Sequence, residues 1–345
     1  MSTSYVCNDD GASKSKSNDD GVCEVNDMLQ NMSTVDDNDV DIPVCANCGK
    51  EGASNTCNKC KMVRYCNAAC KKKHRTKHKK QCERRVAELH DEQLFNDHPT
   101  PEECPICLLP LPSIDQTIFR SCCGKTICSG CILEMIKSDI RQVRQKGGNF
   151  ESAKSVVMDQ LCPFCRTLVP IDNIEEGRRT LKLVESGNTN AMKVLGECYS
   201  DGSWGMPQDW NKANELYLKA GDGGCTGGYY NLGQSYLYGR GVDEDRKKAK
   251  HYFELAAIKG CKEARHTLVL IEDVAGNHDR ATKHSIIGAR AGHEDCLEGV
   301  KLDYMTGSIT KEEYANTLRE YQKRQDEMKS DARAEYAETN IFRED

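Results

Sequence analysis

Residues 45–82 read CANCGKEGASNTCNKCKMVRYCNAACKKKHRTKHKKQC, a segment in which cysteines return in pairs separated by two or three residues. The pairs are Cys45 and Cys48, Cys57 and Cys60, and Cys66 and Cys70, and the series closes with His78 and Cys82. Such spacings bring two side chains onto one metal ion, and eight soft ligands are enough for two tetrahedral zinc ions. The segment is too short to build an apolar core, so we expect metal binding to supply its folding energy.

A second series of paired cysteines follows the first. Its members are Cys104 and Cys107, Cys122 and Cys123, Cys128 and Cys131, and Cys162 and Cys165. These eight ligands again suit two zinc ions. Of the 21 cysteines in the chain, seven belong to the first series and eight to the second. The remaining six are scattered, and we interpret them as free thiols.

The composition favours zinc over disulfide bonds. The first residues have neither the basic start nor the apolar run of a signal peptide, and no apolar stretch approaches the roughly 20 residues that span a bilayer. We therefore expect an intracellular protein, cytoplasmic or nuclear and not secreted, in a reducing compartment where clustered cysteines bind metal. Only 38% of the residues are hydrophobic, which indicates several small metal-stapled units. The net charge of −6 gives no basic field for nucleic acid.

Charge and residue usage divide the chain into segments. The predicted order is a disordered acidic tail at 1–43, a zinc module at 44–90, a linker at 91–101, a second zinc module at 102–170, helical repeats at 177–309, and a C-terminal helix and tail at 310–345. The tail holds ten acidic and two basic side chains and too little apolar surface to fold. The linker is acidic and contains two prolines. We expect one unbroken helix from Thr310 to Thr339, capping the repeats rather than forming a coiled coil.

The first series, with Tyr65 directly before Cys66, resembles the MYND zinc finger over residues 45–82. Ligands interleave in that family. The resemblance therefore implies one zinc ion on Cys45, Cys48, Cys66 and Cys70, and a second on Cys57, Cys60, His78 and Cys82. We expect a helix over about 69–89, which places His78 and Cys82 on one face.

The same resemblance bears on ligand choice and partners. His74 lies one helical turn before His78 and is a rival ligand, but the family register favours His78. MYND domains generally bind short proline-containing peptides, so a peptide partner is implied. We interpret the basic run at 71–85 as a solvated helix face rather than a nucleic-acid site.

The second series resembles an all-cysteine RING finger, most clearly in Cys104-Pro105-Ile106-Cys107 and Cys162-Pro163-Phe164-Cys165-Arg166. RING fingers are cross-braced. The resemblance therefore implies one zinc ion on Cys104, Cys107, Cys128 and Cys131, and a second on Cys122, Cys123, Cys162 and Cys165. Lys125 stands where a common RING has its histidine, and a protonated lysine cannot bind zinc. We expect up to two ions here, one fewer if the adjacent Cys122 and Cys123 cannot both reach the metal.

A helix is predicted after the third cysteine pair of this module. The apolar residues at helical spacing are Ile132, Leu133, Ile136, Ile140 and Val143. We interpret this stripe as core rather than as a partner surface. Gly147-Gly148 should end the helix, and a loop should follow in which Val156 and Val157 return to the core.

RING fingers that act as ubiquitin ligases orient a ubiquitin-loaded conjugating enzyme and form no covalent intermediate. The resemblance implies that Ile106 and Pro163 contact this enzyme and that Arg166 bridges it to ubiquitin, a task suited to a fork of fixed donors. Alternatively, Ile106 and Pro163 only shape the zinc loops and Arg166 is a surface residue. No residue of the sequence is assigned as catalytic, since no phosphate-binding glycine loop, Ser-His-Asp set or SET-like segment is present.

Behind the zinc modules the chain repeats itself. Leu195-Gly196-x2-Tyr199 returns 37 positions later as Leu232-Gly233-x2-Tyr236. The unit resembles Sel1-like repeats, relatives of the tetratricopeptide repeat built from antiparallel helix pairs. A third copy is expected at about 261–292 and a fourth from about residue 295. Single pairs cannot bury their apolar faces, so they must stack, and the concave surface of such stacks usually binds a protein.

The fold class that follows is multidomain: two small cross-braced zinc modules, then an all-α helical-repeat solenoid. The leading hypothesis is a zinc-binding adaptor that acts as a RING-type ubiquitin ligase, with repeats and MYND finger choosing protein partners. The expected partners are a conjugating enzyme and a substrate, without nucleic acid or membrane. The alternatives are a non-catalytic scaffold and a MYND-based transcriptional adaptor.

Overall fold

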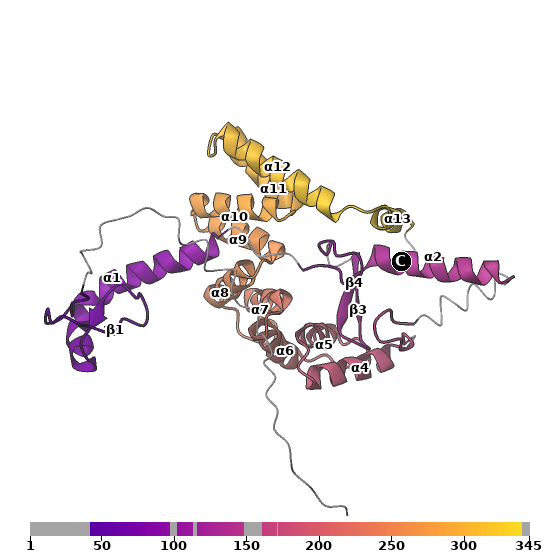
Figure 1. Ribbon diagram of the computed structural model, residues 1–345, viewed down its shortest axis with the longest axis horizontal. Helices are drawn as coiled ribbons and strands as arrows, with labels where there is room; N and C mark the ends of the chain where they lie inside the picture. The colour runs from indigo at the N-terminus through magenta and orange to yellow at the C-terminus, as the bar shows by residue number, and fades with distance from the viewer. Residues whose placement is uncertain (1–41, 97–101, 113–115, 148–160, 171, 340–345) are drawn as a thin grey trace, which may run out of the picture. The chain divides into compact units, whose positions relative to one another are not determined.

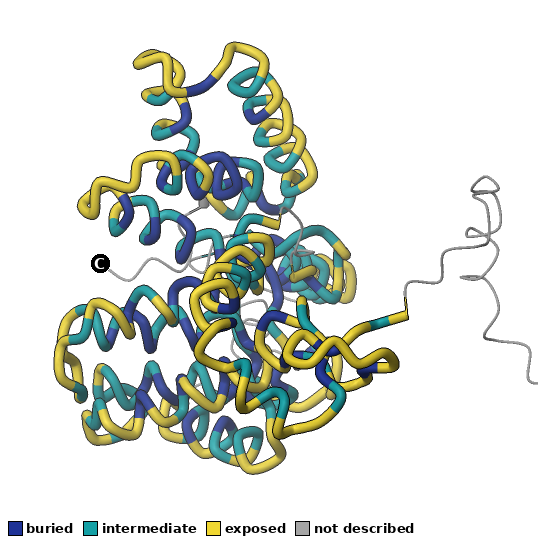
Figure 2. Tube along the Cα trace, turned by 90° about the vertical axis from the view of Figure 1, so that its left-hand side faces the viewer, coloured by how far each residue is buried: buried dark blue, intermediate teal, exposed yellow. Residues whose placement is uncertain are grey.

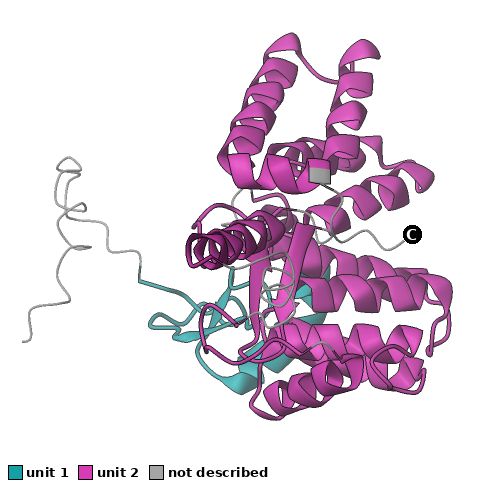
Figure 3. Ribbon diagram, turned by 90° about the vertical axis from the view of Figure 1, so that its right-hand side faces the viewer, with its two compact units in different colours: residues 1–84 teal, residues 85–345 magenta. Residues whose placement is uncertain are grey.

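The computed structural model describes residues 42–96, 102–112, 116–147, 161–170 and 172–339. The chain forms two compact units, residues 1–84 and 85–345 (Figure 3). The predicted acidic tail, up to residue 41, lies outside the described residues, and so do Val156, Val157 and the loop predicted around them. Within the described ranges, no helix has the length and apolar character that crossing a membrane requires.

The first unit is built around its cysteines. Strands β1 (Asn55–Thr56) and β2 (Arg64–Tyr65) form a short antiparallel ribbon. Helix α1 (Ala68–Leu94) follows, and the side chain of Asn67 caps its first turn by accepting a 2.9 Å hydrogen bond from the Cys70 N–H. Tyr65 is buried among the cysteines and is the largest buried side chain of this small core.

The second cysteine-rich module belongs to the larger unit, which begins with the last residues of helix α1. Strands β3 (Thr117–Arg120) and β4 (Lys125–Cys128) form an antiparallel hairpin, and helix α2 (Ser129–Gln145) leads directly out of it. The predicted helix is thus present, and it ends two residues before Gly147, which adopts a left-handed φ of +80°. Its residues Ile132, Leu133 and Ile136 are buried, as the stripe predicts.

The rest of the chain is a stack of helices (Figure 1). The helices are α4 (Asn173–Glu185), α5 (Thr189–Asp201), α6 (Trp210–Asp222), α7 (Thr226–Tyr238), α8 (Arg246–Ile258), α9 (Lys262–Val274), α10 (His278–Arg290), α11 (Glu294–Met305) and α12 (Lys311–Met328). Each helix from α4 to α11 packs against the next, as a helical-repeat solenoid requires. Figure 2 shows buried positions recurring along these helices. The side chains of Asp209 and Asp245 cap α6 and α8 in the same way, so the helix cap is repeated together with the helices.

Two glycines of the repeat signature are needed for helix packing. A Cβ atom on Gly196 would lie 2.6 Å from Tyr217 Cε1, and one on Gly233 would lie 2.7 Å from Phe253 Cε1. Neither space admits a methyl group without movement of a buried ring. These two glycines therefore let the paired helices approach closely.

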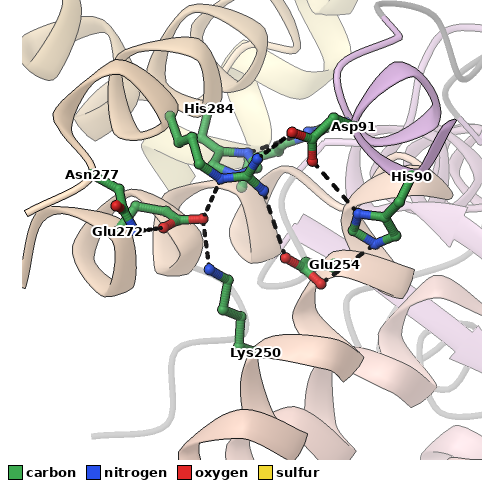
Figure 4. A network of polar contacts seen from close by, with 9 residues as sticks. His90, Asp91, Lys250, Glu254, Glu272, Asn277 and His284 are labelled. Carbon is green, nitrogen blue, oxygen red and sulfur yellow. Dashed lines mark hydrogen bonds and ion pairs between the residues drawn. The ribbon is translucent and has the colours of Figure 1, made fainter. Parts of the chain in front are cut away.

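Helix α1 differs from its prediction at its C-terminal end. It continues to Leu94, five residues past the predicted end and into the segment predicted to be a linker. The reason is burial, because Leu94 is fully buried in the cluster that contains Phe253 and Leu268 of the repeats. Polar contacts add to this anchor: Asp91 accepts a 2.6 Å hydrogen bond from Arg280, and His90 lies 3.5 Å from the Glu254 carboxylate (Figure 4).

The C-terminal region also differs. The single helix predicted from 310 to 339 is wrong, because α12 ends at Met328 and a separate helix α13 (Asp331–Thr339) begins after the extended residue Lys329. Ser330 starts α13, since its side-chain oxygen and its carbonyl both accept hydrogen bonds from the Arg333 N–H. Helix α12 packs on α10 and α11 as a cap should, whereas α13 packs on α2 of the second cysteine-rich module.

Candidate metal centres and an adjoining groove

The MYND-like ligands gather in two groups. Cys45, Cys48, Cys66 and Cys70 bring their sulfur atoms within 4.8 Å of one another. Three of the sulfur–sulfur distances are 3.5, 3.7 and 3.8 Å. Four sulfurs placed 2.3 Å from a central zinc ion would be about 3.8 Å apart, whereas a disulfide bond is about 2.05 Å long. The residues present therefore fit tetrahedral zinc.

The second group of the first unit contains the histidine. Cys57, Cys60, His78 and Cys82 are all buried, and their ligand atoms also lie within 4.8 Å of one another. Cys57 and Cys82 are 3.8 Å apart through sulfur, and His78 Nε2 is 3.1 Å from Cys60 Sγ. The rival ligand His74 lies outside this group. Its Nδ1 is 3.2 Å from the hydroxyl of the buried Tyr65, a contact that gives His74 a structural role.

The RING-like ligands gather in the cross-braced arrangement that the resemblance implies. One group is Cys104, Cys107, Cys128 and Cys131, and the other is Cys122, Cys123, Cys162 and Cys165. Sulfur–sulfur distances are 3.9 and 3.8 Å in the first group and 3.6 Å between Cys123 and Cys162 in the second. The adjacent Cys122 and Cys123 both face the same centre, so their adjacency does not prevent a four-ligand site.

A common backbone turn follows four of the cysteine pairs. Gly49, Lys61, Leu108 and Arg166 each come directly after a pair and have φ values of +70°, +55°, +59° and +57°. Each donates its backbone N–H to the carbonyl of the first cysteine of its pair, at 2.8 to 3.0 Å. Three of the four are not glycine, although this region disfavours other residues. Residue type therefore gave no signal of the turn at those three positions.

Backbone N–H groups in these turns favour the thiolate form. Burial raises the pKa of the Cys104 thiol, but hydrogen bonds from the backbone N–H groups of Cys128, Cys107 and Ile106 outweigh it and lower the pKa to about 7. In the first unit the same opposition between burial and backbone donors lowers the pKa of Cys45 to about 6. Zinc binds the thiolate, so these donors prepare Cys104 and Cys45 for the metal, whereas burial raises the pKa of Cys131.

A groove of about 730 Å³ lies beside the RING-like centres. The three residues that the resemblance assigns to the conjugating enzyme, Ile106, Pro163 and Arg166, all line it. Phe164 lines it as well, and both Ile106 and Phe164 keep 39% of their surface exposed. The wall opposite these loops is helix α2, including Val143, so the predicted core stripe contributes its last residue to this surface.

Comparisons with solved structures find helical-repeat proteins. The Sel1 repeat protein from Oxalobacter formigenes is 18% identical, covering 56% of this chain and 87% of that one, with a TM-score of 0.40. The protective antigen c5321 of uropathogenic Escherichia coli, which displays an SLR fold, is 18% identical, covering 45% of this chain and 42% of that one, with a TM-score of 0.27.

Comparisons with curated proteins find partial matches. A segment of 66 residues, 19% of this chain, is 36% identical to the E3 ubiquitin-protein ligase GW2 of Oryza sativa and covers 11% of that protein. Another of 135 residues, 39% of this chain, is 27% identical to chitin synthase regulatory factor 4 of Schizosaccharomyces pombe and covers 21% of it. The chain thus spans only a small part of the length of these relatives.

Family models identify two of the modules. The MYND finger model matches residues 45–82, and the Sel1 repeat model matches residues 189–225 and 227–261. Both are protein-interaction modules, and the first is a zinc finger. The chain therefore combines a MYND zinc finger with Sel1 repeats, the architecture of a zinc-binding protein-interaction adaptor.

Proposed function

We propose that this adaptor is a RING-type ubiquitin ligase whose groove beside the RING-like centres receives a ubiquitin-loaded conjugating enzyme. The observation that carries the proposal is the convergence of Ile106, Pro163 and Arg166 on one open groove. These residues come from two zinc loops more than 50 positions apart in the chain. The partial match to a ubiquitin ligase adds support.

The groove has the chemistry of a protein-binding surface. Its lining combines exposed apolar side chains with charged and polar residues, a composition typical of protein contacts. Arg166 places a guanidinium beside the apolar pair, and its several donors suit carbonyl groups on two partners at once. In this proposal the groove and Arg166 orient the thioester for attack by a substrate amine, and no covalent intermediate forms on this chain.

Zinc has a structural part in the proposal. Each of the four cysteine-rich groups offers four ligands, which leaves no open position for a reacting group. We propose one ion for each group, four in total. Bound zinc supplies folding energy and fixes the loops, while the protein residues around it make the contacts.

The other modules serve partner choice. We propose that the zinc modules at 44–90 and 102–170 and the repeats at 177–309 act as separate binding surfaces, the repeats for a substrate protein and the MYND finger for a peptide. A stack of helix pairs offers a continuous surface for such binding.

Ubiquitin discharge from loaded conjugating enzymes tests the proposal. The zinc-loaded chain should accelerate discharge from at least one member of a broad panel. Ile106→Ala and Arg166→Ala should abolish the acceleration without loss of zinc. Leu168→Ala and Arg141→Ala are matched controls, because both residues are exposed in the same module and neither lines the groove. Absence of acceleration across the panel would instead favour the non-catalytic scaffold.

A further inference from the structure

The C-terminal helix α13 is seated against the first RING-like zinc loop. Arg333 projects from it and is only 8% exposed. Its Nη1 donates to the carbonyl oxygen of Pro110 at 2.8 Å and to that of Met328 at 2.9 Å, and its Nη2 donates to Cys107 Sγ at 3.3 Å. One guanidinium therefore joins a zinc-ligating sulfur, the end of its loop and the end of α12.

The packing around Arg333 is close. A Cβ atom on Gly130 of α2 would lie 2.8 Å from the backbone nitrogen of Arg333, so α13 rests directly on the backbone of α2. Lys137 of α2 and Glu335 of α13 form an ion pair between the same two helices. The contact is thus specific in both shape and charge.

A buried arginine at this position has an electrostatic reason. A zinc ion with four thiolates carries a net charge of −2, and burial makes an uncompensated charge costly. Charge-assisted hydrogen bonds are stronger than neutral ones, and groups that contact metal ligands tune metal affinity. The hydrogen bond from Arg333 to Cys107 Sγ brings such a positive charge to this group of cysteines.

We infer that Arg333 is an outer-sphere partner of the zinc centre formed by Cys104, Cys107, Cys128 and Cys131, and that it positions the loop bearing Ile106. Ile106 directly precedes Cys107, so the side chain proposed to contact the conjugating enzyme is held through its neighbour. The first half of this inference concerns zinc alone. The second half rests on the proposed ligase function.

Zinc release from the full-length chain tests the first half. Ions are counted by native mass spectrometry while a chelator removes them. Arg333→Met keeps the stem and removes the charge, and we expect one ion per chain to leave about 10- to 100-fold faster. Arg333→Lys keeps the charge but cannot reach both Pro110 and Cys107, and should fall between Met and wild type. Arg319→Met, an exposed arginine of α12, is the control and should match wild type.

The possible results are distinguishable. Zinc release from Arg333→Met at the wild-type rate would overturn the inference. Equal rates of zinc release from Arg333→Lys and Arg333→Met would also overturn it, because the charge would then have no effect. If Arg333→Met does not fold, Arg333→Lys still tests the inference, because zinc release from this variant at the wild-type rate would also contradict it.

Discharge assays under excess zinc test the second half. Arg333→Met should lower the acceleration, and Arg333→Lys should restore part of it. Full acceleration in Arg333→Met would overturn the positioning role. If wild type itself gives no acceleration while Arg333→Met releases zinc faster, the ligase proposal fails and the outer-sphere role stands.

Discussion

Arg280 of α10 donates a 2.6 Å hydrogen bond to Asp91 of α1, across 189 positions of sequence. The same guanidinium donates to Glu272 at 2.9 Å and lies over the ring of Phe95, 5.0 Å from its centroid. Together with the burial of Leu94, these contacts make the end of α1 a part of the solenoid. The helix that carries three of the MYND-like ligands, Cys70, His78 and Cys82, therefore packs against the repeats at its C-terminal end.

This relationship predicts that Leu94→Ala destabilises the repeats. Removing a fully buried leucine side chain should lower the free energy of unfolding by about 2–4 kcal/mol. Val86→Ala is the control, since Val86 is exposed on the same helix and its change should stay within about 0.5 kcal/mol. Urea unfolding followed by circular dichroism measures both. A negligible effect of Leu94→Ala would indicate that residues 91–96 behave as the linker predicted from composition.

The contrast between Leu94 and the cysteines shows what sequence alone can predict. Ligand pairing follows local spacing and a family register, so Cys104 and Cys131 could be placed on one centre in advance. Leu94 follows an acidic stretch and precedes prolines, and nothing local shows which surface it meets. Its burial depends on repeats more than 150 residues later.

Arg333 was missed for a similar reason. A charged residue in a polar C-terminal segment is normally exposed, and only the fold brings it to a cysteine 226 positions earlier. One local signal was present. Ser330 followed by Asp331 is a typical helix start, and it could have divided the single predicted helix into α12 and α13.

His284 predicts a pH dependence of repeat stability. Burial lowers the pKa of His284 to about 3, with the nearby charge of Arg265 acting in the same direction. In the unfolded chain its pKa is about 6.5, so the unfolded state binds the proton first. The contribution of His284 to the free energy of unfolding is therefore fully present above about pH 6.5. It is lost as the pH falls toward 3, by up to about 1.4 kcal/mol per pH unit.

Urea unfolding at pH 7 and pH 5 measures this loss. Between pH 7 and pH 5, the free energy of unfolding should fall by about 2 kcal/mol more in wild type than in His284→Gln. His278→Gln is the control for the change of residue type, because His278 is exposed. The comparison between the variants cancels the effect of acid on zinc binding, which all of them share. Equal losses in His284→Gln and wild type would contradict the buried neutral histidine.

Two glycines of helix α7 should respond to alanine in opposite directions. In Gly233→Ala the new methyl group meets the ring of Phe253 at 2.7 Å, and overpacking should cost about 1–3 kcal/mol. In Gly227→Ala it meets only the flexible Lys193 side chain, at 3.0 Å, so helix propensity should dominate and add up to about 1 kcal/mol. Thermal unfolding of both variants gives the comparison. A similar loss of stability in both variants would mean that the close approach of helices is not specific to the glycine of the repeat signature.

Leu108 predicts how the zinc turns respond to residue type. Its φ is +59°, a region that costs an L-residue about 1–2 kcal/mol, and its side chain is largely exposed. Leu108→Gly removes this strain but adds chain entropy to the unfolded state, so it should leave stability unchanged or raise it by up to about 1 kcal/mol. Leu108→Val adds a β-branch to the same conformation and should speed zinc release.

The variant to compare with it is Gly49→Val in the first unit, where the same turn has φ of +70° and glycine is the native residue. Because Gly49 carries no strain to relieve, its substitution should be the more damaging. Zinc release from Leu108→Val at the wild-type rate would show that the left-handed turn is not required for metal retention.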